Sequence, residues 1–230
     1  MRIEPEIQGA SIVMVGGFNP QIFQPFWFSS HEIISYEDAE SAVIGVIHPE
    51  IASFRVEGDF GLTVERERFM IDRSMAPLVR IADISCKVFG DLLPHTPIRQ
   101  VGINRMVHFS VGTSEIRDRV GEKLAPRVAW GAWGELLSQG EGDKHGGLIS
   151  LTMIQRELKD RAVGSISAKV EPSRLVGRGR TGIYVEINDH YELGGDVDGA
   201  NDIIDIVRSR FDASIAYSDT IVDQIMSLAS

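Results

Sequence analysis

A long alternating stretch near the middle of the 230-residue chain places the strongest constraint on its fold. Between Val101 and Val111 the odd positions are apolar with one exception, whereas the even positions are mostly small or polar. A period of two over this length is typical of a strand with one face buried and the other exposed. The stretch therefore predicts a long strand around which the rest of the chain is organised. Its odd positions are Val101, Ile103, Arg105, Val107, Phe109 and Val111, and its even positions are Gly102, Asn104, Met106, His108 and Ser110.

Arg105 is the exception, because strict alternation places its charge between Ile103 and Val107 on the apolar face. An unpaired charge there would be very unfavourable. Two interpretations stay open: a buried carboxylate pairs with Arg105, or a bulge near Gly102 or Asn104 turns it outward, where it would contribute to a binding surface. Violations of a local pattern are enriched at functional sites, but structural ion pairs produce them too.

The segment before the long strand predicts one strand, a helical stretch, several short strands and a helix. Residues 11–18 form an apolar run that ends in glycines, and Asn19 then has the position of a helix N-cap. Pro25 divides the aromatic stretch that follows into two short helical turns. Between 42 and 73, apolar runs separated by turn-forming residues predict three or four antiparallel strands. Residues 77–93 have the spacing of an amphipathic helix.

The segment after the long strand predicts a similar order. Residues 114–137 have helical spacing interrupted by a proline, and 138–147 is rich in glycine and polar residues, as in a loop. Three alternating runs follow, and 199–228 has the spacing of an amphipathic helix, with Asp198 or Asn201 as its cap. On the predicted solvated side of this helix are Asp202, Asp205, Asp212, Asp219 and Asp223.

These two orders predict an α+β fold built from two β-α-β(3–4)-α units, residues 1–97 and 98–230, fused into one globular unit. Each unit would form an antiparallel sheet with helices on one face, and the two would join into one curved sheet. The arrangement resembles, in its order of elements, the duplicated fold of the TATA-binding protein, and this analogy carries no function. A two-domain α+β protein is the alternative.

Composition argues against several classes of function. With 43% hydrophobic and 24% charged residues, the chain has the composition of a globular protein. Its net charge of −10 argues against binding to nucleic acids or anionic membranes, which both need clustered Lys and Arg. The single cysteine, Cys86, excludes an internal disulfide and a cysteine-rich zinc site. Because we find no secretory signal and no apolar run long enough to span a membrane, we expect a cytoplasmic protein.

No strong catalytic signature is present. The chain contains no G-x-S-x-G, H-E-x-x-H, Walker-type or C-x-x-C motif, and no cofactor is expected. Residues 194–202 contain two aspartates spaced as in a calcium loop, but Val207 stands where such a loop requires a bidentate Glu. Arg174, Arg178 and Arg180 lie in or beside a glycine-rich turn that could hold an anion, although a solvated turn explains these charges more simply.

Five polar residues on the predicted strands are candidate binding residues. An antiparallel sheet with helices on one face commonly leaves the other face in water. We therefore expect a non-enzymatic interaction module that binds a protein partner or another copy of the chain, through this open face or the acidic terminal helix. The alternative is a small hydrolase or nucleotide-processing enzyme in which His108 and Glu186 act as acid and base. The five candidates are Asn104, Arg105, His108, Tyr184 and Glu186.

Three motifs also resemble those of an uncharacterised family of bacterial proteins. They are FNPQIFQPFWF (18–28), HPEIASFRV (48–56) and TPIRQVGINRMVHF (96–109). The resemblance covers roughly the first half of the chain, and the second half matches only in its order of elements. Because that family has no established activity, the resemblance implies a bacterial cytoplasmic protein and assigns no catalytic residue.

Overall fold

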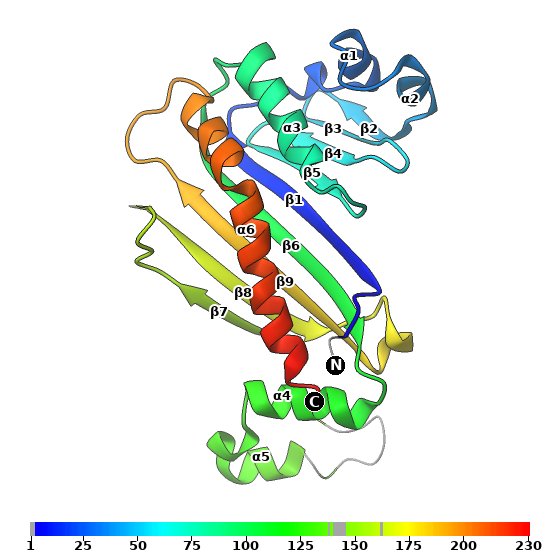
Figure 1. The fold of residues 1–230 in the computed structure, drawn as a ribbon, viewed down its shortest axis with the longest axis vertical. Coiled ribbons are helices and arrows are strands. Elements are labelled where there is room, and N and C mark those ends of the chain that lie inside the picture. Colours follow the sequence, from blue (N-terminus) through cyan, green and yellow to red (C-terminus); the bar gives the residue numbers. More distant parts are fainter. Residues whose placement is uncertain (1–2, 138, 140–145, 162) are drawn as a thin grey trace.

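A single open antiparallel sheet forms the body of the protein. The computed structural model describes residues 3–137, 139, 146–161 and 163–230, and within them nine strands follow the order β2-β3-β4-β5-β1-β6-β9-β8-β7 (Figure 1). The predicted α+β class with an antiparallel sheet is therefore confirmed. The strands are β1 (Ile7–Gly16), β2 (Val43–His48), β3 (Ile51–Arg55), β4 (Gly61–Glu65), β5 (Arg68–Arg73), β6 (Ile98–Ser110), β7 (Leu151–Gln155), β8 (Gly164–Pro172) and β9 (Gly182–Glu192).

The two helices that cross the sheet, α3 and α6, lie on the same face. The long α6 runs over β6 and β9, and α3 lies beside it over β1 and β5 (Figure 1). The shorter α1 and α2 lie near β2, whereas α4 and α5 lie beyond the end of the sheet that α6 reaches. The helical elements are η1 (Pro20–Ile22), α1 (Pro25–Ser30), α2 (Tyr36–Ser41), α3 (Arg80–Cys86), η2 (Lys87–Leu92), α4 (Ser114–Leu124), η3 (Arg127–Trp130), α5 (Gly131–Leu137), η5 (Gly177–Gly179) and α6 (Asn201–Ser227).

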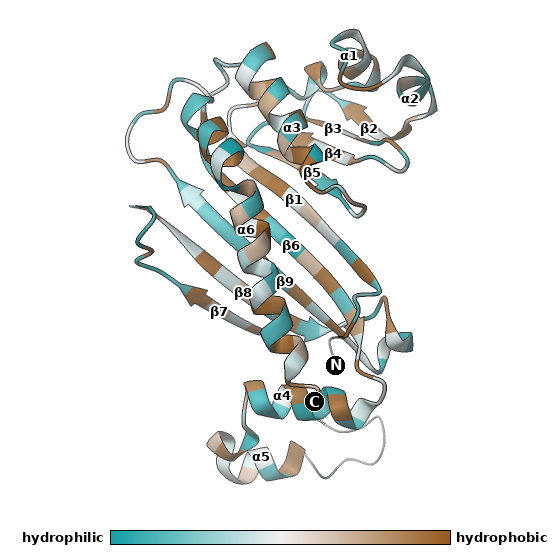
Figure 2. Cartoon of the chain, viewed as in Figure 1, coloured by the Kyte–Doolittle hydropathy of each residue, from teal (hydrophilic) through white to brown (hydrophobic). Residues whose placement is uncertain are grey.

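The alternating stretch that dominates the sequence is β6, which lies beside the middle strand β1. It pairs with β1 on one side and with β9 on the other, so that Ile103 lies between Ile12 and Asp189. Its apolar odd positions are buried under α6, as the alternation predicts. Figure 2 shows apolar and polar residues alternating along the strands that lie behind this helix.

Two apolar cores lie between the sheet and its helices. The large core contains thirty-one buried residues, eight of them phenylalanines, and extends from β3 to the first part of β6 and the first half of α6. The small core contains twelve buried residues, with Phe109 as its one phenylalanine, under the last part of α6. Ile103 belongs to the large core and Val107 to the small core. The residue between these two, Arg105, therefore lies at the boundary.

Arg105 is buried at this boundary and pairs with a carboxylate of α6. Its Nε lies 2.7 Å from Asp219 Oδ1, and its Nη1 donates a hydrogen bond to the Gly9 carbonyl at 3.2 Å. The structure thus has the buried pair and not the outward-turned side chain. The prediction that Asp219 lies on the solvated side of the helix was wrong, because the carboxylate turns to Arg105 and only 37% of the side chain is exposed.

The start of α6 also differs from the prediction. Neither Asp198 nor Asn201 caps the helix; Ala200 occupies the N-cap position and contributes no side-chain hydrogen bond. The Ala200 amide instead donates to the Pro94 carbonyl at 2.9 Å. A side chain at Gly199 would lie 2.8 Å from the same oxygen, so close backbone packing, not capping, determines where the helix begins.

The remaining predicted elements are found close to their expected positions. The four runs between 42 and 73 form β2 to β5, and Asn19 caps η1 by accepting the Gln21 amide. The spacing at 77–93 corresponds to α3 and η2, and the interrupted spacing at 114–137 to α4, η3 and α5. Most of the predicted loop at 138–147 lies outside the described residues.

Candidate functional site

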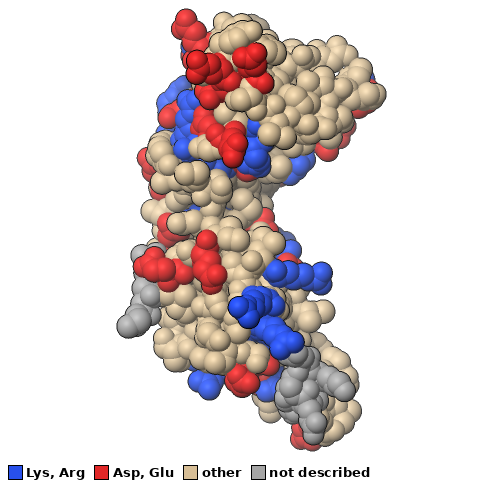
Figure 3. Space-filling model, turned by 90° about the vertical axis from the view of Figure 1, so that its right-hand side faces the viewer, with Lys and Arg blue, Asp and Glu red and all other residues tan. Residues whose placement is uncertain are grey.

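The sheet face opposite α6, here called the open face, carries four of the five candidate binding residues. Asn104 and His108 project from β6, and Tyr184 and Glu186 project from β9, on the side opposite the buried positions. Arg105 alone lies on the other face, in its pair with α6. Figure 3 shows the molecule turned by 90°: it is bent, with a hollow on the side away from α6. The open face therefore lies in a concave surface.

The His108 ring is held in place by two contacts. It stacks on Tyr184, directly opposite in the register, with ring centroids 4.5 Å apart and 30° between the planes. Its Nδ1 lies 2.8 Å from Ser173 Oγ, which also accepts the Leu175 amide at 3.1 Å. The Ser173 proton can then point at Nδ1, an arrangement that favours a neutral ring protonated at Nε2. Burial lowers the pKa of His108, which also favours the neutral form.

Tyr184 and its neighbours form a polar row across the same part of the open face. The Tyr184 hydroxyl donates to Glu186 Oε2 at 3.1 Å. Burial, and then the nearby negative charge of Glu186, raise the pKa of Tyr184, so the phenol remains a donor. On β8, Lys169 lies opposite Glu186 and forms an ion pair with Glu171 at 2.9 Å. Among the hydrogen bonds of the described residues, none joins His108 to Glu186; Tyr184 contacts both.

Small and amide residues occupy the centre of the open face. Asn104 is buried and donates from Nδ2 to Ser11 Oγ at 3.2 Å. Asn188 lies opposite Asn104 in the register, and its buried Oδ1 has no hydrogen-bond partner among the described residues. A side chain at Gly102 would lie 2.9 Å from this oxygen, so glycine leaves room for it. The open face therefore contains an unused acceptor near its centre, a group that is unfavourable unless something donates to it.

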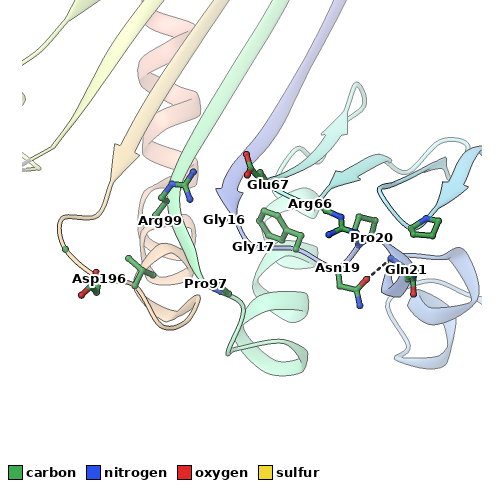
Figure 4. A pocket seen from close by; sticks show the side chains of 14 residues that line it. Gly16, Gly17, Asn19, Pro20, Gln21, Arg66, Glu67, Pro97, Arg99 and Asp196 are labelled. Atoms are coloured by element: carbon green, nitrogen blue, oxygen red, sulfur yellow. Dashed lines mark hydrogen bonds between the residues drawn. The ribbon is translucent and has the colours of Figure 1, made fainter.

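A second concave feature, the end cavity, lies where β1 ends and β6 begins (Figure 4). Its volume is about 760 Å³. Each of the segments 18–28, 48–56 and 96–109 contributes lining residues, among them Asn19, Pro49 and Pro97. A side chain at Gly16 would lie 2.3 Å from the Pro97 carbonyl oxygen, so only glycine allows the two strands to approach here.

The end cavity is lined by charges of both signs. Arg66 is paired with Glu50 at 2.5 Å. Figure 4 shows Arg99 and Asp196 on the side of the cavity opposite Arg66 and Gln21. This mixed lining gives no preference for an anion or a cation. The sequence patterns described above did not predict this cavity. The features that could have indicated it are the glycine pair at the end of β1 and the prolines that line the cavity.

Other chemistry has little support among the described residues. They contain no group of three or more His, Cys, Asp or Glu side chains arranged to hold a metal ion. Burial raises the pKa of the half-buried Cys86 thiol, which disfavours the reactive thiolate. None of the described helices is both long and apolar enough to cross a membrane. Neither a comparison with protein-family models nor a search of curated proteins finds a match for this chain.

Proposed function

We propose that this protein is a non-enzymatic binding module that uses its open face to bind another protein. The observation that carries the proposal is the one-sided cover of the sheet: α3 and α6 lie on one face, and the other is hollowed and lined by half-buried polar side chains. Both hydrogen-bond donors and acceptors lie there, among them the side chains of Lys169, Tyr184 and Glu186. Mixed polarity of this kind suits a protein surface better than a polyanion.

The open face is a better candidate than the acidic side of α6. Two of the aspartates predicted on that side are engaged within the chain, Asp219 by Arg105 and Asp205 by Arg208 at 2.8 Å. The apolar side of α6 already covers both cores. On the open face, Tyr184 and Glu186 are hydrogen-bonded to each other and half-buried, and they lie in a hollow that a partner could enter.

The enzyme alternative, with His108 and Glu186 as acid and base, needs both groups within reach of one substrate. Tyr184 stacks against His108 and donates a hydrogen bond to Glu186, so one side chain already engages both groups. Neither residue lines the end cavity. These observations favour binding over catalysis.

Two broader inferences accompany the proposal. We propose that the sheet arose by duplication, because β1 and β6 are adjacent and each is followed by helices, an antiparallel set of strands and a helix on the covered face. We also propose a cytoplasmic location, since the single Cys86 offers no disulfide.

Site-specific photocrosslinking in cells tests the proposal. A photoreactive phenylalanine analogue replaces Ser167, a half-buried residue of β8 on the open face, or Asp212, an exposed residue on the outer side of α6. We expect a discrete protein adduct from position 167 and none from position 212. Adding Glu186→Gln and His108→Gln to the first variant should reduce the yield of that adduct.

Two outcomes would overturn the proposal. An adduct from position 212 alone would show that the partner binds at α6 and not at the open face. The absence of adducts from both positions would contradict the proposal that the protein is a binding module. An adduct that contains only a second copy of the chain would identify the partner as the protein itself.

A further inference from the structure

The two edges of the sheet differ in how they are protected. At one edge, the pairing of β2 shifts register between Ile44 and Val46, a bulge that interrupts the ladder. At the other edge, β7 pairs with β8 without a shift from Leu151 to Gln155, and it contains neither a charged residue nor a proline. Edge strands of soluble proteins are commonly protected by such features. Among the described strands β7 pairs with β8 alone, so its outer backbone groups are available to another strand.

A cavity of about 310 Å³ opens beside the first residue of β7. Its lining includes Ser150, which precedes β7, and Val170, which lies opposite Leu151. Trp130 and Trp133 line it from the helical side, with ring centroids 5.5 Å apart. The two residues are 59% and 56% exposed, although tryptophan usually buries most of its surface. Accessible tryptophans beside an apolar cavity are typical of protein interfaces.

The charged side chains around this cavity neutralise one another. Arg127 pairs with Glu122, and Arg117 pairs with Asp118 at 2.9 Å. Glu171 is likewise engaged by Lys169. The cavity therefore favours an uncharged, apolar group over a charged one.

We infer that the β7 edge and this cavity together bind an extended segment of a partner polypeptide. The segment adds to β7 as a further strand through main-chain hydrogen bonds, and one large apolar side chain enters the cavity. An extended polypeptide backbone can pair with the row of donors and acceptors along β7 that water otherwise hydrates, and an uncharged apolar side chain suits the cavity beside it. This site lies at the sheet edge and does not depend on binding at the open face.

A second copy of the chain that pairs about the centre of β7 fits this edge less well than a different partner. In a two-fold pairing of β7 with itself about Met153, Gln155 of one copy lies opposite Leu151 of the other. The residues brought toward the cavity are then Arg156 and Glu157, which are charged. The next apolar residue, Leu158, already packs against the small core. In this register, self-pairing offers no free apolar side chain for the cavity.

Fluorescence titration with designed peptides tests the inference. The probes are capped heptapeptides that alternate Thr and Val around a central Phe, Leu or Met, each also made with N-methyl groups that block strand pairing. A Trp27→Phe variant confines the emission to Trp130 and Trp133, because the chain has three tryptophans. We expect saturable binding by at least one probe, weakened about tenfold or more by N-methylation, a loss of about 1.4 kcal/mol.

Matched variants test whether the central side chain of the probe enters the cavity. Trp133→Ala should weaken the best probe about tenfold, whereas Val128→Ala, an exposed apolar residue that does not line the cavity, should leave its affinity unchanged. Replacing the central residue of the probe by Ala should weaken its binding to the parent protein and leave its binding to the Trp133→Ala variant unchanged. Three results would overturn the inference: no saturation by any probe, equal affinity of the N-methylated forms, or a dimer in sedimentation that depends on Trp133.

Discussion

The large and small cores lie under the same helix and against the same sheet, yet they are built differently. In the large core, phenylalanines contact one another; Phe89, for example, packs against Phe18, Phe23 and Phe69 with centroids 4.9 to 6.1 Å apart. The small core is mostly aliphatic, and three of its residues, Val120, Val170 and Ile183, line a cavity together with the exposed Trp133 of α5. The comparison suggests that the first half of the sheet supplies most of the stability and the second half most of the accessible apolar surface.

The strongest test of this difference removes one phenylalanine from each core. Phe89→Ala should lower the free energy of unfolding by about 4–5 kcal/mol, and Phe109→Ala by about 3–4 kcal/mol, since both rings are fully buried but only Phe89 lies in an aromatic cluster. Urea denaturation measures both values. Asp212→Ala, a control at an exposed position, should change the free energy of unfolding by less than about 0.5 kcal/mol. A larger loss for Phe109→Ala would reverse the proposed ranking of the cores.

The second test acts at the boundary between the cores. Arg105→Met should destabilise the protein by about 1–3 kcal/mol, because it leaves the Asp219 carboxylate without its partner. The value is below that of a fully buried pair, since water reaches part of Asp219. Thermal and urea unfolding measure it.

A double variant separates the pair from the packing. Arg105→Met with Asp219→Leu replaces both charges by apolar groups and should recover most of the lost stability. If the double variant were no more stable than Arg105→Met alone, the charge on Asp219 would not be the cause of the loss.

The smallest effect concerns His108, on the open face behind the small core. Burial lowers its pKa in the folded protein, so the unfolded chain takes up a proton first as the pH falls. The stability contributed by the neutral ring is present above the ordinary pKa of about 6.5 and is lost as the pH falls through the lower, folded value. Between about pH 7.5 and 5.5, the melting temperature of the parent protein should therefore fall more than that of His108→Gln. Parallel curves for the two proteins would contradict this role.

The sequence predicted the strands and helices well where a single physical rule applies to a continuous segment. Alternation located β6, and helical spacing located α6 to within two residues at its start. The side predicted for Asp219 was wrong because a helical wheel gives only the angle of each residue around the helix, and a polar residue beside the apolar arc is then assumed to face solvent; the wheel contains no information about a charge on another element. The same limitation left Arg105 with two interpretations until the partner helix was placed over it.

The candidate site was predictable only in part. Alternation placed Asn104, His108, Tyr184 and Glu186 on the polar side of their strands, and the structure brings them onto one face. The contact of His108 with Ser173 depends on where β8 ends relative to β6, which no local pattern specifies. The end cavity and the cavity beside β7 are formed by segments far apart in the chain, so no single segment predicts either one; the glycine pair and the proline-containing motifs indicate the end cavity only when taken together.

The place of β1 in the sheet has a consequence for how the protein is made. This strand precedes both of its partners in the chain, and its residue Ile12 must find Ile71 on one side and Ile103 on the other. Pairings over such sequence distances form slowly, because the loops between them must be closed first. During synthesis β1, the middle strand of the finished sheet, is therefore unpaired for longer than the other strands. Its apolar face is accessible to a chaperone during that time.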